Sequence, residues 1–267
     1  MTNYTQYQGA GVANTDRTPS PSIWADFPSG DIRVGIKDGW EIWDDFVPGG
    51  RVAAGAEANY GDYLGFASTG GSVTDGDEVG GVAALSSDGD DEGASLRSAM
   101  LPFQISRTSG KLWFECRVKT STITDTKHGI FVGLMGNSTL TATSPITAAG
   151  ALADVNLVGF HRLEGDGDMF DCVYKADLVT QVTVLADAVT LVADTYVKLG
   201  MVFDPRTYVL TFYRNGVKIA TYTIPTAQGT DFPNDVRLGL VMAVLNATAS
   251  TPGSAKIDWW RAGQLAA

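Results

Sequence analysis

The stretch TYVLTFYRNGVKIATYTI, Thr207 to Ile224, decides the fold class of this chain. Asn215-Gly216 supplies the two residues of positive φ that a tight two-residue β-hairpin turn needs. Alternating apolar and polar residues flank this pair on both sides, as they do in half-buried strands. The stretch therefore predicts two antiparallel strands joined by a hairpin turn.

Segments of the same kind fill most of the chain. LWFECRVKT (Leu112–Thr120) alternates apolar and polar positions, which predicts a strand with one buried face. VRLGLVMAVLN (Val236–Asn246) is apolar on both faces and predicts a buried central strand. Other strands are expected in GIFVGLM, NLVGFHRL, MFDCVYK, LVTQVTV (178–184) and TYVKLGMVF, which are rich in β-branched and aromatic residues.

Helical periodicity does not alternate with these strands, so a βαβ architecture is excluded. One turn of helix is expected after Ser144-Pro145, where a capping residue and a first-turn proline precede ITAAGALA. The pattern predicts an all-β protein with two antiparallel sheets packed face to face and an extended N-terminal arm.

The beginning of the chain differs from the rest. Residues 1–22 carry few large apolar side chains and end in TPSPS, which predicts an extended arm. IWADF (Ile23–Phe27) and IWDDF (Ile42–Phe46) follow, and their aromatic residues are expected to join the arm to the body of the protein. The tryptophans of this segment are also suited to anchoring on a neighbouring protein. The predicted division is an arm at residues 1–46 and a sandwich at 47–267. The predicted partner-binding residues are Trp24, Phe27, Trp40, Trp43 and Phe46.

The composition limits the classes of partner. The 267 residues are 44% hydrophobic and only 18% charged, as in a folded protein, and the net charge is −11. Because no cluster of Lys or Arg offsets this charge, we expect neither nucleic acid nor an anionic membrane as a partner. No apolar run approaches the roughly 20 residues that span a bilayer, and the N-terminus lacks the pattern of a signal peptide. A protein made in a cytoplasm is the simplest reading.

LEGDGDMFD (Leu163–Asp171) is the most acidic candidate site. A calcium loop of the EF-hand kind that begins at Asp166 would need an oxygen ligand at its fifth position, where Phe170 stands. The frame fails, so no metal is predicted here, while a calcium site of another kind stays open.

Glu164, Asp166 and Asp168 also have a catalytic reading. Their E-x-D-x-D spacing resembles the signature of the laminarinase-like glycoside hydrolases, in which paired carboxyl groups cleave the glycosidic bond. Those enzymes carry Glu at the last position, and here Gly165 and Gly167 favour a turn over a strand. We therefore expect a hairpin tip between VGFHRL and MFDCVYK.

Other reactive residues give little sign of chemistry. His128 and His161 have no second metal ligand at a suitable spacing and are expected to be packed or solvated. Cys116 and Cys172 lie in apolar segments and are expected to be buried thiols, although a disulfide between them stays open. No motif for a nucleotide or other cofactor occurs, so no cofactor is predicted.

Several segments carry a resemblance to known families. FYRNGVKIAT resembles the hairpin near the end of concanavalin A-like lectin/glucanase and laminin-G-like sandwiches. A longer set resembles virion proteins of tailed bacteriophages, which are structural or capsid-associated proteins built on the concanavalin A-like jelly roll. The resemblance implies that fold for this chain, a two-sheet antiparallel jelly-roll sandwich. That similarity runs from about residue 45 to 265, through GGVAALSS, KLWFECRVK, IFVGLM, FDCVYKAD, VADTYVKLGMVFD, FPNDVRLGLVMAVLN and IDWWRAGQL.

The resemblance implies a non-catalytic structural protein of a phage virion, most simply a decoration or cement protein on the capsid surface. Its partners would be the major capsid protein and further copies of itself, and it would be made in the host cytoplasm. The chain is accordingly expected not to be an enzyme. Two alternatives stay open on the same fold: a carbohydrate-binding or tail-associated adhesin module, and a glycoside hydrolase using Glu164 and Asp168. A head location and a tail location are not separated.

Overall fold

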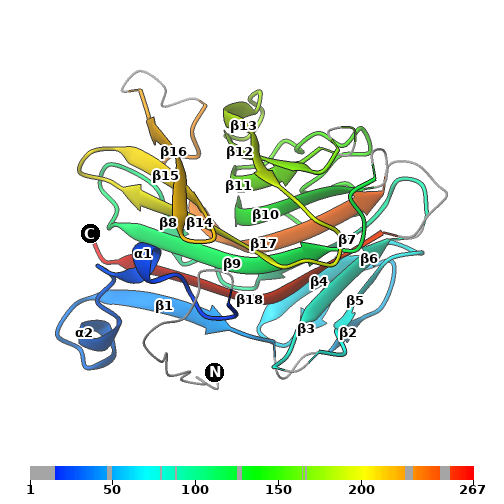
Figure 1. The fold of residues 1–267 in the computed structure, drawn as a ribbon, viewed down its shortest axis with the longest axis horizontal. Coiled ribbons are helices and arrows are strands. Elements are labelled where there is room, and N and C mark those ends of the chain that lie inside the picture. The colour runs from blue at the N-terminus through cyan, green and yellow to red at the C-terminus, as the bar shows by residue number, and fades with distance from the viewer. Residues whose placement is uncertain are drawn as a thin grey trace.

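A computed structural model describes residues 16–46, 50–78, 80–87, 89–124, 128–163, 165, 167–225, 231–246 and 253–267. Two antiparallel sheets pack face to face (Figure 1). This confirms the predicted all-β jelly-roll sandwich. No helix among these residues has the length and apolar character needed to cross a membrane.

Sheet A follows the spatial order β16-β15-β14-β9-β18-β6-β5-β2, and β1 pairs with the second half of β18. Its strands are β1 (Gly39–Asp44), β2 (Arg51–Val52), β5 (Ser72–Asp75), β6 (Ala83–Ser87), β9 (Leu112–Thr120), β14 (Val197–Asp204), β15 (Val209–Arg214), β16 (Val217–Thr223) and β18 (Gly253–Leu265).

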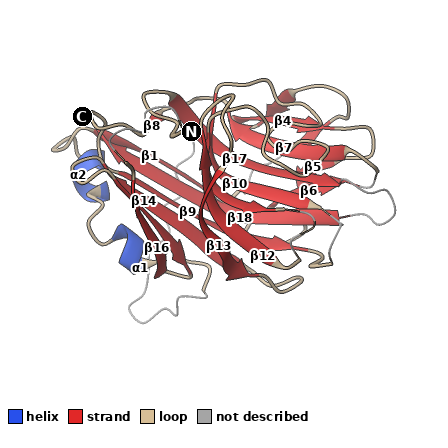
Figure 2. Cartoon of the chain, turned by 90° about the horizontal axis from the view of Figure 1, so that it is seen from above, coloured by secondary structure: helices blue, strands red, loops and turns tan. Residues whose placement is uncertain are grey.

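Sheet B follows the order β13-β12-β11-β10-β17-β7-β4-β3, and β8 pairs with β17. Its strands are β3 (Ala58–Tyr60), β4 (Tyr63–Ala67), β7 (Glu92–Ser98), β8 (Phe103–Gln104), β10 (Gly129–Gly136), β11 (Leu157–Arg162), β12 (Met169–Lys175), β13 (Val182–Thr190) and β17 (Arg237–Asn246). Two short helices, α1 (Pro21–Trp24) and α2 (Ser29–Arg33), lie at the end of the sandwich that carries the C-terminus (Figure 2).

The strand predictions hold in the centre of each sheet. Leu112, Phe114, Cys116 and Val118 of β9 enter the main core between the sheets, as their alternation predicts. β17 is buried along nearly its whole length. The hairpin turn lies at Asn215 and Gly216, with φ of 48° and 74°.

Three details differ from the predictions. The strand expected at residues 178–184 begins later, as β13 from Val182, because 176–181 form a turn and its approach. No helical turn follows Pro145. The segment instead folds back on itself through an Ile146–Leu152 bridge, and its apolar side chains cover the outer face of sheet B. The outer face of β9 is also buried at Trp113 and Glu115, which are 1% and 0% exposed.

The N-terminal residues explain this last difference. Ile23, Trp24 and Phe27 form a small apolar cluster with Trp113 of β9 and Val202 of β14. Residues 39–44 are strand β1, paired with β18, so this part of the predicted arm lies within sheet A. The domain division at residue 46 stays a prediction, and residues 1–15 lie outside the described part of the chain.

Candidate functional site

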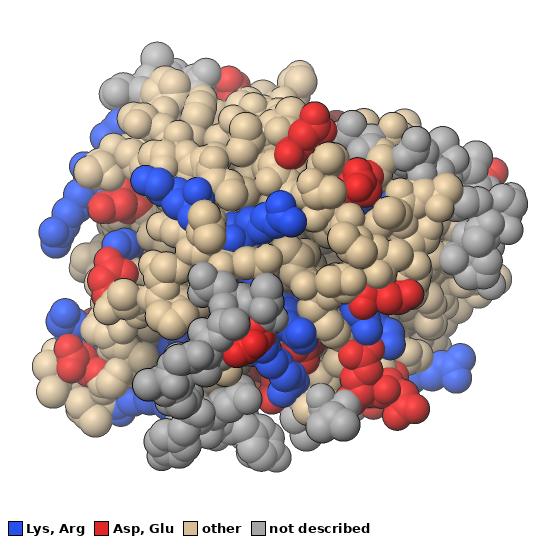
Figure 3. Space-filling model, in the orientation of Figure 1, with Lys and Arg blue, Asp and Glu red and all other residues tan. Residues whose placement is uncertain are grey.

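A groove of about 540 Å³ opens where the β14–β15 turn, residues 107–111 and the last residues of the chain meet. This volume lies within the range of pockets that hold small ligands, roughly 300–1,000 Å³. Its polar lining combines three cations with two carboxylates: Arg107, Lys111, Arg206, Asp26 and Asp204. Figure 3 shows acidic and basic side chains interspersed on the face that carries β9 and β14.

Asp26 is fixed on one side of the groove by two donors. It follows α1, and its carboxylate accepts the indole N–H of Trp113 at 2.8 Å and contacts the ammonium group of Lys111. Partial burial raises the pKa of Asp26, but the hydrogen bonds from Lys111 and Trp113 outweigh it and hold the pKa below its ordinary value. The groove therefore presents an ionised, oriented carboxylate at neutral pH.

The sequence Asp204-Pro205-Arg206-Thr207 forms the turn between β14 and β15, and its first three residues also line the groove. The Asp204 side chain accepts the backbone N–H of Arg206 at 2.9 Å, and Pro205 fixes its own φ between them. Arg107 approaches from the segment ahead of β9, with its guanidinium 4.0 Å from the centroid of the Tyr208 ring. The Tyr208 ring thereby supports the side chain of Arg107, and the turn fixes the backbone of Arg206 beside the groove.

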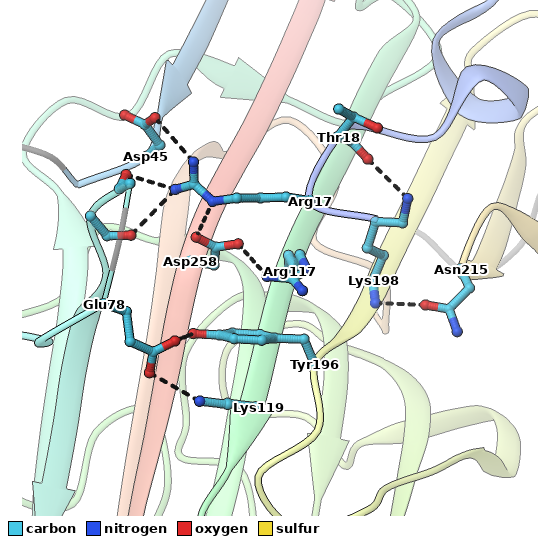
Figure 4. Close-up of polar contacts among 12 residues, drawn as sticks. Arg17, Thr18, Asp45, Glu78, Arg117, Lys119, Tyr196, Lys198, Asn215 and Asp258 are labelled. Atoms are coloured by element: carbon cyan, nitrogen blue, oxygen red, sulfur yellow. Dashed lines mark hydrogen bonds and ion pairs between the residues drawn. The ribbon is translucent and has the colours of Figure 1, made fainter. Parts of the chain in front are cut away.

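A second polar region covers the outer face of sheet A (Figure 4). Asp258 of β18 accepts hydrogen bonds from Arg17 at 2.8 Å and from Arg117 at 2.5 Å. Arg117 in turn lies 3.9 Å from the centroid of the Tyr196 ring. These contacts tie the N-terminal segment to β9 and β18.

Glu78 forms the other half of this region. Its carboxylate accepts hydrogen bonds from Lys256 at 2.7 Å and from the Tyr196 hydroxyl at 2.8 Å, and pairs with Lys119 at 3.0 Å. Burial raises the pKa of Glu78, yet these three donors outweigh it and lower the pKa to about 2. The charged groups of this region therefore pair with one another, while the Nε of Arg117 is buried without a hydrogen-bond partner among the described residues.

Glu115 lies beneath the N-terminal segment. Its Oε2 accepts the backbone N–H of Ser20 and the indole N–H of Trp24, both at 2.8 Å, whereas Oε1 has no hydrogen-bond partner among the described residues. Burial raises the pKa of this carboxyl above its ordinary value, against the lowering effect of the bonds from Ser20 and Trp24 and of the Lys198 charge. The Lys198 ammonium donates to the Thr18 carbonyl at 2.9 Å. Residues 16–28 therefore cover this face of the sheet.

The five aromatic residues predicted to bind a partner contact this chain's own sandwich. Trp24 and Phe27 pack edge to face at 5.3 Å and are 8% exposed, and Phe46 is buried between Tyr63 and Trp260. Trp43 lies 5.0 Å from the guanidinium of Arg261. Trp24, Phe27 and Phe46 are therefore buried against this chain's own sandwich, whereas Trp40 is 36% exposed. A role of the five residues in binding a partner stays a prediction.

The acidic stretch 163–171 joins β11 to β12, which pair as an antiparallel hairpin, as expected. Glu164 and Asp166 lie outside the described residues. Gly167 has a φ of 63°, and its carbonyl accepts the Arg162 Nε–H at 2.7 Å, so a turn forms at this glycine.

The histidines and cysteines are packed. His128 and His161 are buried, with a hydrogen bond to Thr120 and to the Gly150 carbonyl respectively. Cys116 and Cys172 are free, buried thiols, which confirms that reading. Within the described ranges, no three His, Cys, Asp or Glu side chains gather in a way that could hold a metal ion. The expectations of no metal and no cofactor stay predictions.

None of the groove residues was singled out from the sequence. The Asp-Pro-Arg-Thr turn after β14 is a recognisable turn signal, but turns of that kind are common and carry no chemistry alone. Asp26 lies inside IWADF, a segment whose pattern indicates an aromatic anchor and gives no sign of a binding site. Only the fold brings residues 26, 107–111, 204–206 and 265–267 together.

No protein-family model and no curated protein matches this sequence. Solved structures do match the fold. A protein of unknown function from Shewanella oneidensis MR-1 matches with a TM-score of 0.56 at 14% identity, covering 90% of this chain and 94% of that one.

Two enzymes match at similar levels. An endo-β-1,4-glucuronan lyase from Trichoderma reesei has a TM-score of 0.54 at 9% identity, with 84% of this chain and 94% of that chain covered. An endo-1,3-β-glucanase from Streptomyces sioyaensis has a TM-score of 0.51 at 13% identity, with 86% and 97% covered. At such identities the matches show a shared fold, the concanavalin A-like lectin/glucanase jelly roll.

These matches overturn one prediction. The expectation that the chain is not an enzyme is wrong, because the fold on which it rested also serves a lyase and a glucanase. A sandwich of this kind does not decide between binding and catalysis, since that difference lies in the side chains of a site.

Proposed function

We propose that this protein binds carbohydrate, and that the groove beside the C-terminal strand is the binding site. The observation that carries the proposal is the groove itself: a concave volume of about 540 Å³ lined by polar groups that hydrogen bonds hold in orientation. The proposal takes up the carbohydrate-binding alternative predicted from the sequence.

The lining suits a polyhydroxylated ligand. Asp26 and Asp204 offer carboxylate oxygens that accept from sugar hydroxyls, while Lys111 and the arginines offer donors. Sugar rings present adjacent hydroxyls that both donate and accept, so a mixed lining matches them better than an apolar pocket would. The contacts of Asp26 with Trp113 and of Asp204 with Arg206 hold these groups in place before a ligand arrives, which lowers the entropic cost of binding.

The fold adds support of a general kind. Among solved structures of the same architecture, one is of a glucanase and another of a glucuronan lyase, both named for a carbohydrate polymer. Because the identities are 13% and 9%, no residue role is transferred from them. The proposal therefore stands on the groove of this chain.

Calorimetric titration with soluble glucans and polyuronates tests the proposal, with release of new chain ends measured in parallel. Thr108→Trp places a large ring in the groove at an exposed lining residue, and Thr221→Trp places the same ring on the exposed edge strand β16. We expect a glycan that binds the native protein to lose at least tenfold in affinity for the Thr108 variant and to keep its affinity for the Thr221 variant. Equal affinity for both variants would place the site elsewhere.

The virion role suggested by the phage resemblance stays a prediction, together with the major capsid protein as a partner, self-association and a place on the capsid surface. A sedimentation assay of the purified protein with undecorated phage heads would test it. It is separate from carbohydrate binding.

A further inference from the structure

We infer that the groove selects an acidic sugar, with the guanidinium groups of Arg107 and Arg206 receiving its carboxylate. This inference rests on the proposed carbohydrate-binding function and adds the chemical class of the ligand.

Arg107 is held in place without being neutralised. Its guanidinium lies 4.0 Å from the centroid of the Tyr208 ring, and Tyr208 is 5% exposed, so a buried aromatic face supports the stacked group. The Tyr208 hydroxyl donates to the Asn234 side chain at 3.3 Å, which helps to fix the ring. Stacking uses the face of the guanidinium and leaves the N–H groups at its edge available to an acceptor.

Arg206 is placed by its turn. The Asp204 carboxylate bonds to the backbone N–H of Arg206, so this contact orients the residue while leaving its side chain free to extend. The side chain is exposed at the rim of the same groove. Two arginines therefore reach one concave volume from different loops.

The ion pairs of the described residues involve neither guanidinium. Lys111, by contrast, pairs with Asp26 in the groove. Among the lining side chains, three cations stand against two carboxylates, in a chain whose net charge is −11. An anion approaching the protein as a whole is repelled, so arginines without acidic partners are the groups that would make this groove favourable to a carboxylate.

A matched pair of ligands tests the inference. Cello-oligosaccharides and their counterparts oxidised at every C6 differ only in CH₂OH against COO⁻, so any difference in affinity reports on the carboxylate. We expect the native protein to bind the oxidised oligosaccharide roughly tenfold or more tightly, as charge-assisted bidentate contacts allow. The preference should weaken with salt, because it is electrostatic.

The Arg107→Gln, Arg206→Gln double variant should lose this preference, because its affinity should fall much further for the oxidised oligosaccharide than for the neutral one. Arg51→Gln, an exposed arginine on β2 at the opposite edge of sheet A, should keep both. Equal binding of the two ligands by the native protein, or a preference that survives in the double variant, overturns the acidic selectivity alone. Binding of neither ligand by the native protein overturns the proposed function together with this inference.

Discussion

Trp24 donates its indole N–H to the buried carboxylate of Glu115 at 2.8 Å, across 91 positions of sequence. Through this bond and that of the Ser20 amide, the N-terminal segment supplies two donors to Oε2 of an acidic group that faces outward from a central strand of sheet A. The segment thus completes the sheet, because without it Glu115, Trp113 and Val202 would be open to solvent.

Replacing Trp24 by Phe tests this relationship. The variant keeps an aromatic ring but leaves Glu115 Oε2 with the Ser20 amide as its remaining donor, and an incompletely bonded buried acceptor costs about 1–3 kcal/mol. Urea unfolding should show a loss in that range. Trp40→Phe is the matched control, because Trp40 is 36% exposed, and its loss should stay within about 0.5 kcal/mol. Equal losses would mean that the indole bond is unimportant.

The raised pKa of Glu115 predicts a dependence of stability on pH. The unfolded chain releases this proton near the ordinary value of 4.5, whereas the folded chain holds it to a higher pH. The stability contributed by the protonated form is therefore complete below pH 4.5 and declines as pH rises toward the raised pKa. In Glu115→Gln this decline should vanish, so the variant should gain stability relative to the native protein between pH 4.5 and 8. A difference that stays constant over that range would argue against the raised pKa.

Glu78 should show the opposite sign. Its pKa falls from 4.5 to about 2 on folding, so the stability that it contributes is present above pH 4.5 and is lost as pH falls toward 2. Glu78→Gln should cost about 1 kcal/mol at pH 7, the scale of a partly exposed ion pair, and the cost should shrink steadily toward pH 3. Urea denaturation of the native protein and the variant at several pH values measures this cost in unfolding free energy. An unchanged cost at low pH would contradict the account of the Lys119, Lys256 and Tyr196 contacts.

The hairpin turn gives a prediction about backbone conformation and packing. A Cβ atom on Gly216, whose φ is 74°, would lie 2.8 Å from Ser22 Oγ and 2.9 Å from Ser20 Cβ. Gly35 has almost the same φ, 73°, but open space around its Cα. Gly35→Ala should therefore cost only the left-handed conformation, about 1 kcal/mol, while Gly216→Ala should cost clearly more. Similar melting temperatures for the two variants would show that the N-terminal segment does not press on this turn.

Much of the fold could be predicted because its signals are local. The alternation of Leu112 to Thr120, the Asn-Gly pair and the apolar run of β17 each specify a strand or turn within a few residues. The cover over the outer face of sheet A could not be predicted in this way. Its bonds join residues far apart, such as Arg17 to Asp258 over 241 positions, and no periodicity of either segment records the other.

The candidate site could not be predicted from local patterns either, because its residues are far apart in the sequence. The acidic stretch at 163–171 is a candidate site on sequence alone because its carboxyl groups lie close together in the chain. Asp26 and Asp204 each stand without a second acidic residue beside them, so no local pattern marks them. Three loops and the C-terminal residues must first be placed by the two sheets before their charges share one groove. A site of this kind is read from the fold.

The most direct test of the central claim is a crystal structure of the full chain with a bound oligosaccharide that calorimetry has shown to bind. The account predicts density for the sugar in the groove, with hydroxyl groups on Asp26 and Asp204 and an acidic group, where present, on Arg107 and Arg206. Density for the sugar on another surface, with this groove left to solvent, would contradict it.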